Sequence, residues 1–389
     1  MMFFPKIFKC RTSCLSLFAL ARLKRSNKNG IAVVLALATM MMVVTAALEL
    51  HINERNSMLD TAMMRDHLSA EEMATSGVNL AMAILIKDRL EGETDSLQED
   101  WADAETLAAL TSDIPFEQGK VELKIIDELS KIQINALVTF PEGREFNTPQ
   151  LNLWQRFGGG LISAVELLEG ASKLSSKESG KEPPDPLAII NSIKDWLDSG
   201  DDDAITGLNG AESDYYKSLD PPYACKNGPI DDLSELLLIK GITPELFAGT
   251  GGVSGLSQYV TVYGAEKSGD NKFTFPGKIN INTADAAVLS ALMPPESAEF
   301  VPLLIEYREA KSGAVYTNNL TRPDWYRSVP GFAEAQVDAS LITVASNFFR
   351  IESTAQIENV KVHVTAVVER FKPKDSEPWQ CKVLNWKTQ

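Results

Sequence analysis

The sequence predicts an α+β protein: a long N-terminal helix packed on a small antiparallel sheet, with a large all-helical domain inserted in the sheet. An apolar run at residues 31–48 continues into a pattern with apolar residues three and four positions apart, which is typical of a helix. Strand-like alternation appears at 120–134 and returns at 348–371. Helical patterns and turn-rich loops lie between these strands, so one sheet is interrupted by a helical domain.

The apolar run at residues 31–48 contains 18 residues and no charge. As a helix it would be about 27 Å long, which matches the hydrocarbon core of a bilayer. Basic residues precede the run and Glu49 follows it. The positive-inside rule therefore predicts that residues 1–30 stay in the cytoplasm and that the rest of the chain crosses the membrane.

Three interpretations of this run remain open. It is a plain membrane anchor, or a secretory signal cut near the small residues 44–46, or a prepilin-type leader. The third interpretation rests on a basic segment that ends in glycine directly before the run, where a dedicated peptidase would cut between Gly30 and Ile31. Leu35 then occupies the fifth mature position, at which pilins usually carry glutamate.

The remaining pattern divides the chain into four parts. A basic leader at 1–30 precedes a helix at 31–95, whose transmembrane half is 31–52 and whose apolar pattern is interrupted at Asp66. The predicted sheet body covers 96–138 and 345–389, and the inserted helical domain covers 139–344. The predicted strands are 120–125 and 131–134, which form a hairpin, then 348–354, 361–371 and 381–384; the predicted helices are 151–157, 161–168, 187–197, 233–239, 284–292 and 301–309.

Charge argues against a nucleic-acid-binding protein. The formal net charge is -16, and residues 1–30 contain seven basic residues and no acidic ones. The rest of the chain therefore has 30 basic and 53 acidic residues, a charge of -23. Because affinity for nucleic acids depends on Lys and Arg that neutralise phosphates, such a body is unsuited to bind them. With three histidines in all, a histidine-rich metal centre is also excluded.

Motifs of common enzymes are absent from the sequence, which contains no HExxH, GxSxG or GxxxxGK[ST]. The glycine-rich stretch 249–255 nearly matches GxGxxG, but its last glycine comes one position late and no strand precedes it. We therefore interpret this stretch as a loop and expect no catalytic activity.

One acidic segment is a candidate calcium site. Its carboxylates are Asp198, Asp201, Asp203, Glu212 and Asp214, and Gly200 would permit a turn among them. Calcium prefers six to eight oxygen ligands in an adaptable loop. The alternative is a solvated acidic loop whose aspartates cap the next helix, and spacing alone does not decide between the two.

Two cysteines, Cys225 and Cys381, lie in the part of the chain that would be exported. Disulfides are permitted in that compartment. One bridge is therefore possible, and two free thiols are the alternative, because the sequence does not give the distance between them.

Residues 236–245 and 279–284 resemble pieces of helix-hairpin-helix modules that bind DNA backbones. Here Asp231, Asp232 and Glu235 surround the first piece with negative charge. We interpret both pieces as a structural use of the same helical shape.

Several motifs together resemble the type II secretion minor pseudopilin K family. The similarity covers residues 29–371. The motifs are DWLD at 195–198, NGAESDYY at 209–216, PPY at 221–223, NGPIDDLSEL at 227–236, KGITPE at 240–245, the segment 127–135, and ININ-TA at 279–284. Leu35 stands where other pilins have the fifth-position glutamate, and the K family resembled here typically lacks that glutamate.

The resemblance implies a pilin-like body and a subunit at the tip of a short periplasmic pseudopilus. It implies partnership with two other minor pseudopilins, of the I and J types, with the major pseudopilin and with the prepilin peptidase. It also implies an inner-membrane location with a cytoplasmic N-terminus, a role in starting pilus assembly for export of folded proteins, and calcium binding by the helical domain. Two rival hypotheses are a membrane-anchored periplasmic enzyme with an unrecognised site and a helix-hairpin-helix DNA receptor of a competence system.

Overall fold

The computed structural model describes residues 28–114, 116, 118–173, 185–199, 205–269, 272–374 and 376–389, with only the backbone at 28–29 and 161–173. Its first element is α1, a single helix from Lys28 to Glu91. The interruption of the apolar pattern at Asp66 does not interrupt this helix. The chain divides into two units between Arg65 and Asp66, and each is described by itself.

The first unit, in its described part, is the portion of α1 up to Arg65. Its side chains are exposed almost throughout, including large apolar residues such as Met41 (74%) and Met42 (73%). A helix with an apolar surface on all sides is unfavourable in water and suits a lipid environment.

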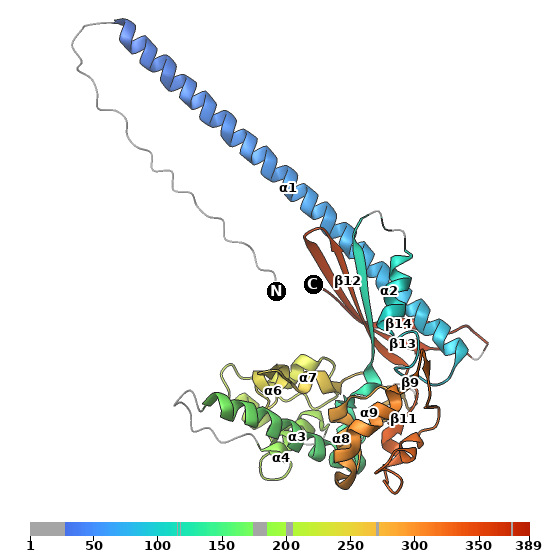
Figure 1. Ribbon diagram of the computed structural model, residues 1–389. Helices are drawn as coiled ribbons and strands as arrows, with labels where there is room; N and C mark the ends of the chain where they lie inside the picture. The colour runs from blue at the N-terminus through green and yellow to red at the C-terminus, as the bar shows by residue number, and fades with distance from the viewer. Residues whose placement is uncertain are drawn as a thin grey trace. The chain divides into compact units, whose positions relative to one another are not determined.

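The second unit contains a four-stranded antiparallel sheet in the order β1-β12-β13-β14 (Figure 1). The strands are β1 (Lys120–Asp127), β12 (Phe348–Ile357), β13 (Val360–Phe371) and β14 (Gln380–Thr388). β1 and β12 are hydrogen-bonded neighbours, although residues 128–347 lie between them in the chain. The second half of α1 packs on one face of this sheet. The sheet, this half of α1 and α2 (Ala104–Ser112) together form what we call the body.

Close approach of α1 to the sheet depends on Gly77. A Cβ at this position would overlap the hydroxyl of Ser353 in β12 and would contact Val121 in β1 at 3.0 Å. Apolar residues of β12 and β13 alternate between buried and less buried positions, as the sequence pattern predicts. The inner positions form one apolar core with α1, which includes Leu85, Trp101 and Phe349.

The predicted hairpin at 120–134 is wrong in its second half. After β1 the chain turns through a short 3-10 helix, η1 (Glu128–Ser130), and leaves the sheet. β2 (Ile132–Gln133) pairs in parallel with β5 (Val260–Thr261) instead. Both segments alternate, but alternation does not tell which core a strand joins.

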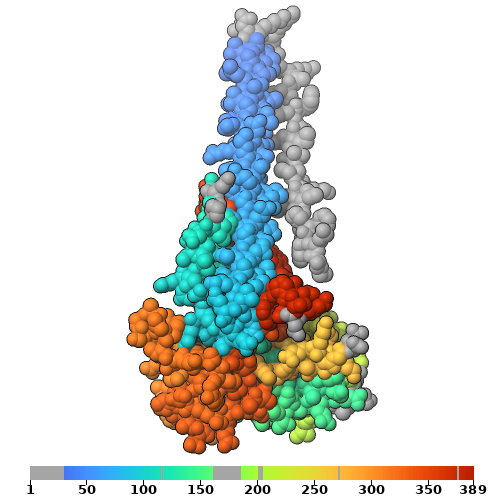
Figure 2. Space-filling view, turned by 90° about the vertical axis from the view of Figure 1, so that its right-hand side faces the viewer, coloured from blue at the N-terminus to red at the C-terminus, as the bar shows by residue number. Residues whose placement is uncertain are grey.

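The residues between β1 and β12 bury an apolar core of their own, and we call this part of the second unit the helical domain. That core begins at Ile132 rather than at the predicted boundary of 139, and it extends to Ile342. In the space-filling view the two halves of the domain, coloured green to yellow and orange, lie next to each other (Figure 2).

The elements of the helical domain are short apart from its first two helices. The α-helices are α3 (Thr148–Lys173), α4 (Pro186–Leu197), α5 (Ser213–Lys217), α6 (Pro244–Ala248), α7 (Leu256–Tyr259), α8 (Ala286–Leu292) and α9 (Val301–Glu309). The further 3-10 helices are η2 (Ile134–Leu137), η3 (Leu233–Leu238), η4 (Pro295–Phe300), η5 (Trp325–Ser328) and η6 (Ala339–Leu341). The remaining strands are β3 (Gly249–Thr250), β4 (Val253–Ser254), β6 (Glu266–Lys267), β7 (Phe273–Thr274), β8 (Ile279–Asn280), β9 (Lys311–Ser312), β10 (Val315–Tyr316) and β11 (Ile342–Thr343).

Candidate functional site

The predicted cleavage position lies in the first turns of α1. Gly30 and Ile31 are the third and fourth residues of the helix, and Ile31 is exposed. Leu35, one turn further, is exposed as well. The helix from Gly30 onward has a window of mean hydropathy 2.6, so it is long and apolar enough to cross a membrane. Residues 1–27 of the predicted leader lie outside the described residues.

The acidic segment of the helical domain is organised by Asp195, the third-last residue of α4. Its carboxylate accepts hydrogen bonds from the backbone N–H groups of Thr206 (3.0 Å) and Ala211 (2.8 Å). Gly210 is required next to it, because a Cβ there would overlap Asp195 Oδ2. Burial raises the pKa of Asp195, and the hydrogen bonds from Thr206 act against that rise. This carboxylate therefore holds the backbone at Thr206 and Ala211 against α4.

The predicted calcium ligands are only partly placed by the structure. Asp198 ends α4, and its carboxylate accepts a hydrogen bond from Lys194 Nζ at 2.5 Å. Glu212 is buried directly before α5, and Asp214 is exposed in the first turn of that helix. Asp201 and Asp203 lie outside the described residues. Within the part of the chain that the structure describes, the carboxylates of Asp198, Glu212 and Asp214 do not converge on one point.

Cys225 and Cys381 are free thiols, so the bridge that the sequence permits is not formed. Cys225 is buried in the helical domain with its Sγ 3.4 Å from the carbonyl oxygen of Asp195. Cys381 lies in β14 with its Sγ 3.8 Å from the carbonyl oxygen of Met82. Burial raises the pKa of Cys225 to about 12 and that of Cys381 to about 11, so both thiols are protonated and unreactive at neutral pH.

A carboxylate cluster that the sequence analysis missed lies at the end of α1. One oxygen each of Asp88, Asp95 and Glu99 lie within 4.8 Å of one another. The cation among them is Arg370 of β13, which donates to Asp88 at 2.9 Å and to Asp95 at 2.5 Å. The same guanidinium donates to the carbonyl oxygens of Leu85 and of Ser346 in the segment before β12. The cluster thus ties α1, the loop after it and the sheet together.

One guanidinium does not neutralise three neighbouring carboxylates. Burial raises the pKa of Asp88 to about 6, and the nearby charge of Asp95 adds to the rise. Burial also raises the pKa of Glu99 to about 7, with the charge of Asp88 as the second cause. Glu99 therefore carries a proton in a large fraction of molecules at neutral pH.

A second buried polar group joins the body to the helical domain. Glu128, directly after β1, is fully buried and accepts hydrogen bonds from Arg350 of β12 (2.6 Å), Lys131 (3.2 Å) and Thr261 of β5 (2.5 Å). Burial works against the charge of Glu128, but Lys131 and Arg350 hold its pKa below the usual value. A carboxylate that contacts both parts fixes the helical domain against the sheet.

The adjacent Asp127 forms the other half of this junction. It is buried and accepts hydrogen bonds from Asn280 (2.8 Å) and Thr283 (2.7 Å) of the helical domain. Asn280 also donates to the carbonyl oxygen of Asp95 in the body. Burial raises the pKa of Asp127 to about 6. The sequence signal for this site was the pair Asp127-Glu128, which opens the segment 127–135 on which the family resemblance partly rests.

Comparison with known proteins agrees with this architecture. A sequence model of the family described as "Type II secretion system (T2SS), protein K" matches residues 162–265. Type II secretion system protein K of Klebsiella pneumoniae is 27% identical over 279 residues, which cover 69% of this chain and 72% of the relative. The protein of the same name from Aeromonas hydrophila is 23% identical, over 77% of this chain and 80% of the relative. The chain is thus similar to type II secretion system protein K over about seven tenths or more of its length.

A solved structure shares the fold of this chain. It is the GspK-GspI-GspJ complex of the type II secretion system from enterotoxigenic Escherichia coli, matched with a TM-score of 0.58 and 19% identity. The match covers 85% of this chain and 99% of that chain. The two chains therefore share a fold, as the motifs of the sequence predicted.

The two pieces of this chain that resemble helix-hairpin-helix modules are used internally. Lys240, the basic residue of the first piece, donates to the carbonyl oxygens of Asn209 and Gly210, and its ammonium lies 5.0 Å from the ring centre of Tyr215. Gly241 follows with φ of +89°, a conformation that favours glycine. The charge that a DNA-binding hairpin would present to a phosphate is thus bound to the protein's own backbone.

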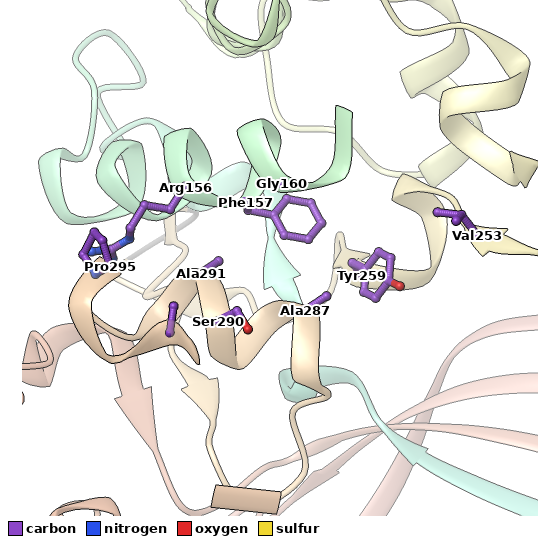
Figure 3. A pocket seen from close by; sticks show the side chains of 10 residues that line it. Arg156, Phe157, Gly160, Val253, Tyr259, Ala287, Ser290, Ala291 and Pro295 are labelled. Carbon is purple, nitrogen blue, oxygen red and sulfur yellow. The ribbon is translucent and has the colours of Figure 1, made fainter. Parts of the chain in front are cut away.

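A pocket of about 500 Å³ lies between α3 and α8 of the helical domain (Figure 3). Its walls are mainly apolar: Phe157 and Gly160 come from α3, and Ala287 and Ala291 come from α8. Arg156 lies at one end of it, and burial lowers the pKa of this guanidinium. The polar side-chain groups of its described lining are the guanidinium of Arg156 and the hydroxyls of Tyr259 and Ser290.

Proposed function

We propose that this protein is a minor pseudopilin, the tip subunit of the type II secretion pseudopilus, where it starts pilus assembly and so supports export of folded proteins across the outer membrane. The observation that carries the proposal is the position of the helical domain. It is inserted between β1 and β12 and is bonded to the body through Asp95, at the end where α1 stops. A domain of this size at that end would obstruct the stacking of a further copy on top.

The side chain at Leu35 supports the same position. In pilins a glutamate at the fifth mature position is thought to neutralise the N-terminal amine of a neighbouring subunit inside the membrane. A carboxylate in lipid is costly unless it is paired. A subunit at the tip has no subunit above it to provide that amine, so an apolar residue is favoured here.

The tip position can be tested by labelling. An epitope inserted at Gly313, in the exposed turn between β9 and β10, would mark the helical domain without entering its core. We expect immunogold particles at one end of each isolated pseudopilus, and the same epitope on the major pseudopilin should decorate the whole shaft. Particles along the shaft from the Gly313 insertion would contradict the tip assignment.

We infer the partners from the relative whose structure is known. That protein is in a complex with GspI and GspJ. We propose that this chain likewise binds the I-type and J-type minor pseudopilins of its own system, with the major pseudopilin below them. Full-length proteins mixed in detergent should form a three-component complex with one copy of each, measured by light scattering. A chain that stays separate from both would overturn this proposal.

We also propose that the inserted domain binds calcium through the acidic segment. Glu212, buried before α5, and the exposed Asp214 are the described oxygen ligands that suit a hard cation. Asp198 is paired with Lys194, so it could bind calcium only after this ion pair is broken. Calcium should raise the melting temperature of the full chain, and Glu212→Gln should reduce that rise. The control Glu334→Gln, at an exposed position elsewhere in the domain, should keep it; an unchanged melting temperature of the wild type would refute the site.

The proposed orientation places residues before α1 in the cytoplasm and the body in the periplasm. The apolar helix and the similarity to protein K agree with an inner-membrane anchor. The support for the orientation is the seven basic residues among 1–30. In this arrangement prepilin peptidase would cut between Gly30 and Ile31, on the cytoplasmic side.

A further inference from the structure

The pocket between α3 and α8 has small residues on two facing walls. Gly160 of α3 lies on one wall, and Ala287 and Ala291 of α8 lie on the other, one helical turn apart. Ser290 belongs to the same face of α8 (Figure 3). Where two helices pack tightly, larger side chains fill the space between them. Here the small residues leave about 500 Å³, which is within the range of pockets that hold a small molecule.

Packing does not require a glycine at position 160. Residues 158–160 are three successive glycines inside α3, although glycine in the interior of a helix is unfavourable relative to alanine. A Cβ at Gly160 would meet no atom of the described residues within 4 Å. Because no described neighbour excludes a side chain here, the role of this glycine is the space that it leaves in the pocket.

Arg156 is a cation without an anionic partner at one end of this pocket. Its Nε atom is buried and has no hydrogen-bond partner among the described residues. Burial lowers the pKa of the guanidinium, because a charge is disfavoured where water is excluded. The charge of Glu296, an exposed residue of η4, acts against this effect but does not offset it. A partly buried cation of this kind is stabilised when an anion binds next to it.

The charged and apolar parts of the pocket lie at different places along its length. Figure 3 shows Arg156 beside Pro295 at one end, the ring of Phe157 in the middle, and Tyr259 and Val253 at the other end. The rings of Phe157 and Tyr259 are in edge contact, with their centroids 5.6 Å apart. A ligand that matches this arrangement has one negative charge at its end and an apolar chain behind it. A carboxylate suits the guanidinium, since its two oxygens accept two parallel hydrogen bonds.

We propose that this pocket binds an amphiphilic monocarboxylate, with its carboxylate at Arg156 and its apolar chain between Gly160 and the alanines of α8. One guanidinium balances one negative charge, whereas a phosphate monoester carries nearly two at neutral pH. A small inorganic anion would leave the apolar walls in contact with water, which is unfavourable. The site lies within the helical domain, so it does not depend on the proposed position at a pilus tip.

Calorimetric titration of the full-length protein in lipid nanodiscs tests the proposal. The probe is octanoate, and octylammonium is the match with the same chain length and the opposite charge. Titration of empty nanodiscs gives the heat of partition into lipid, which is subtracted. We expect octanoate to bind about tenfold more tightly than octylammonium, because only the carboxylate pairs with Arg156. Equal affinities for the two probes, or no saturable binding of octanoate, would overturn the proposal.

Variants of α3 test the charge and the space separately. Arg156→Met should weaken octanoate binding about tenfold, and Arg156→Lys about threefold, since lysine keeps the charge but loses the planar geometry. Gly160→Leu should fill the pocket and weaken binding more than about tenfold, while the higher helix propensity of leucine preserves the fold. The matched control Gly159→Leu, at a residue that does not line the pocket, should stay within about twofold of the wild type. Binding that survives Gly160→Leu, or that is lost equally in both leucine variants, would refute the site.

Discussion

The body and the helical domain reach a buried core by different means. The strands of the body are 8 to 12 residues long and pair over long stretches of regular register. The strands of the helical domain contain 2 residues each, and several of its helices begin at aspartate caps, namely Asp185, Asp232 and Asp285. The comparison teaches that side-chain alternation shapes the body, whereas local capping shapes the helical domain.

The two regions also differ in how they bury charge. The body holds three carboxylates around Arg370, with only one guanidinium to balance them. In the helical domain the buried Asp195 is satisfied by backbone N–H groups of a neighbouring loop. The stability of the body should therefore depend on pH and on one arginine, and the stability of the helical domain on turns and caps.

Among the variants proposed here, the loss of Arg370 should reduce the free energy of unfolding the most. We expect Arg370→Met to lower the free energy of unfolding by about 3–5 kcal/mol, because it leaves Asp95 buried without its counter-ion. The control Arg322→Met removes an exposed pair with Asp324 and should cost less than about 1 kcal/mol. Denaturant unfolding followed by circular dichroism measures both. Equal losses for the two variants would show that the cluster does not stabilise the body.

A methyl group at Gly77 should destabilise the body, whereas a methyl group at Gly159 in the helical domain should not. We expect Gly77→Ala to cost about 1–3 kcal/mol, because the added Cβ overlaps the Ser353 hydroxyl where α1 meets the sheet. Ser353→Ala should remove most of this overlap, so the double variant should recover part of the loss in a double-mutant cycle. Gly159→Ala, in α3 of the helical domain with no atom within 4 Å of the added Cβ, is the control and should not destabilise.

Acidification should stabilise the body through Glu99. Its pKa of about 7 in the folded protein lies above the usual value of 4.5, so the folded state binds the proton more tightly. The free energy of unfolding should thus fall as pH rises from about 4.5 to 7 and should then level off. Glu99→Gln should flatten this dependence in thermal melts, and Glu105→Gln, at an exposed position of α2, should not. A wild-type melting temperature that rises steadily from pH 4.5 to 7 would contradict this prediction, because stability would then change with pH in the opposite direction.

The smallest expected effect is at a cap of the helical domain. The carboxylate of Asp285 accepts hydrogen bonds from the N–H groups of Ala287 and Val288 at the start of α8. Asp285→Ala should cost about 1 kcal/mol, and Asp285→Ser should retain most of the stability because serine is also a good cap. Melting temperatures compare the two. Equal stability of the alanine and serine variants would mean that capping does not hold this helix.

The regular elements could be predicted because their patterns are local. Alternation at 348–354 and 361–371 predicted the two strands observed as β12 and β13. The helical periodicity predicted α4 and α9 nearly to the residue. The segment 131–134 was assigned to the wrong core, since Ile132 and Ile134 alternate equally well in either.

The long-range polar groups could not be predicted from the sequence. Arg370 meets Asp88 across more than two hundred residues, and no motif marks either of them. Glu128 is buried only because Arg350 and Lys131 converge on it from different elements. The acidic segment at 198–214 was visible in the sequence, but spacing does not reveal that Asp198 is paired with Lys194.

The measurement that tests the pseudopilin assignment most directly is the N-terminus and the intact mass of the protein, expressed with and without prepilin peptidase. With the peptidase the chain should begin at Ile31, and without it the chain should keep its leader. An uncut chain in both cases, or a cut after Ala46 or Ala47, would contradict the assignment. The protein would then be an ordinary membrane anchor or an ordinary secreted protein.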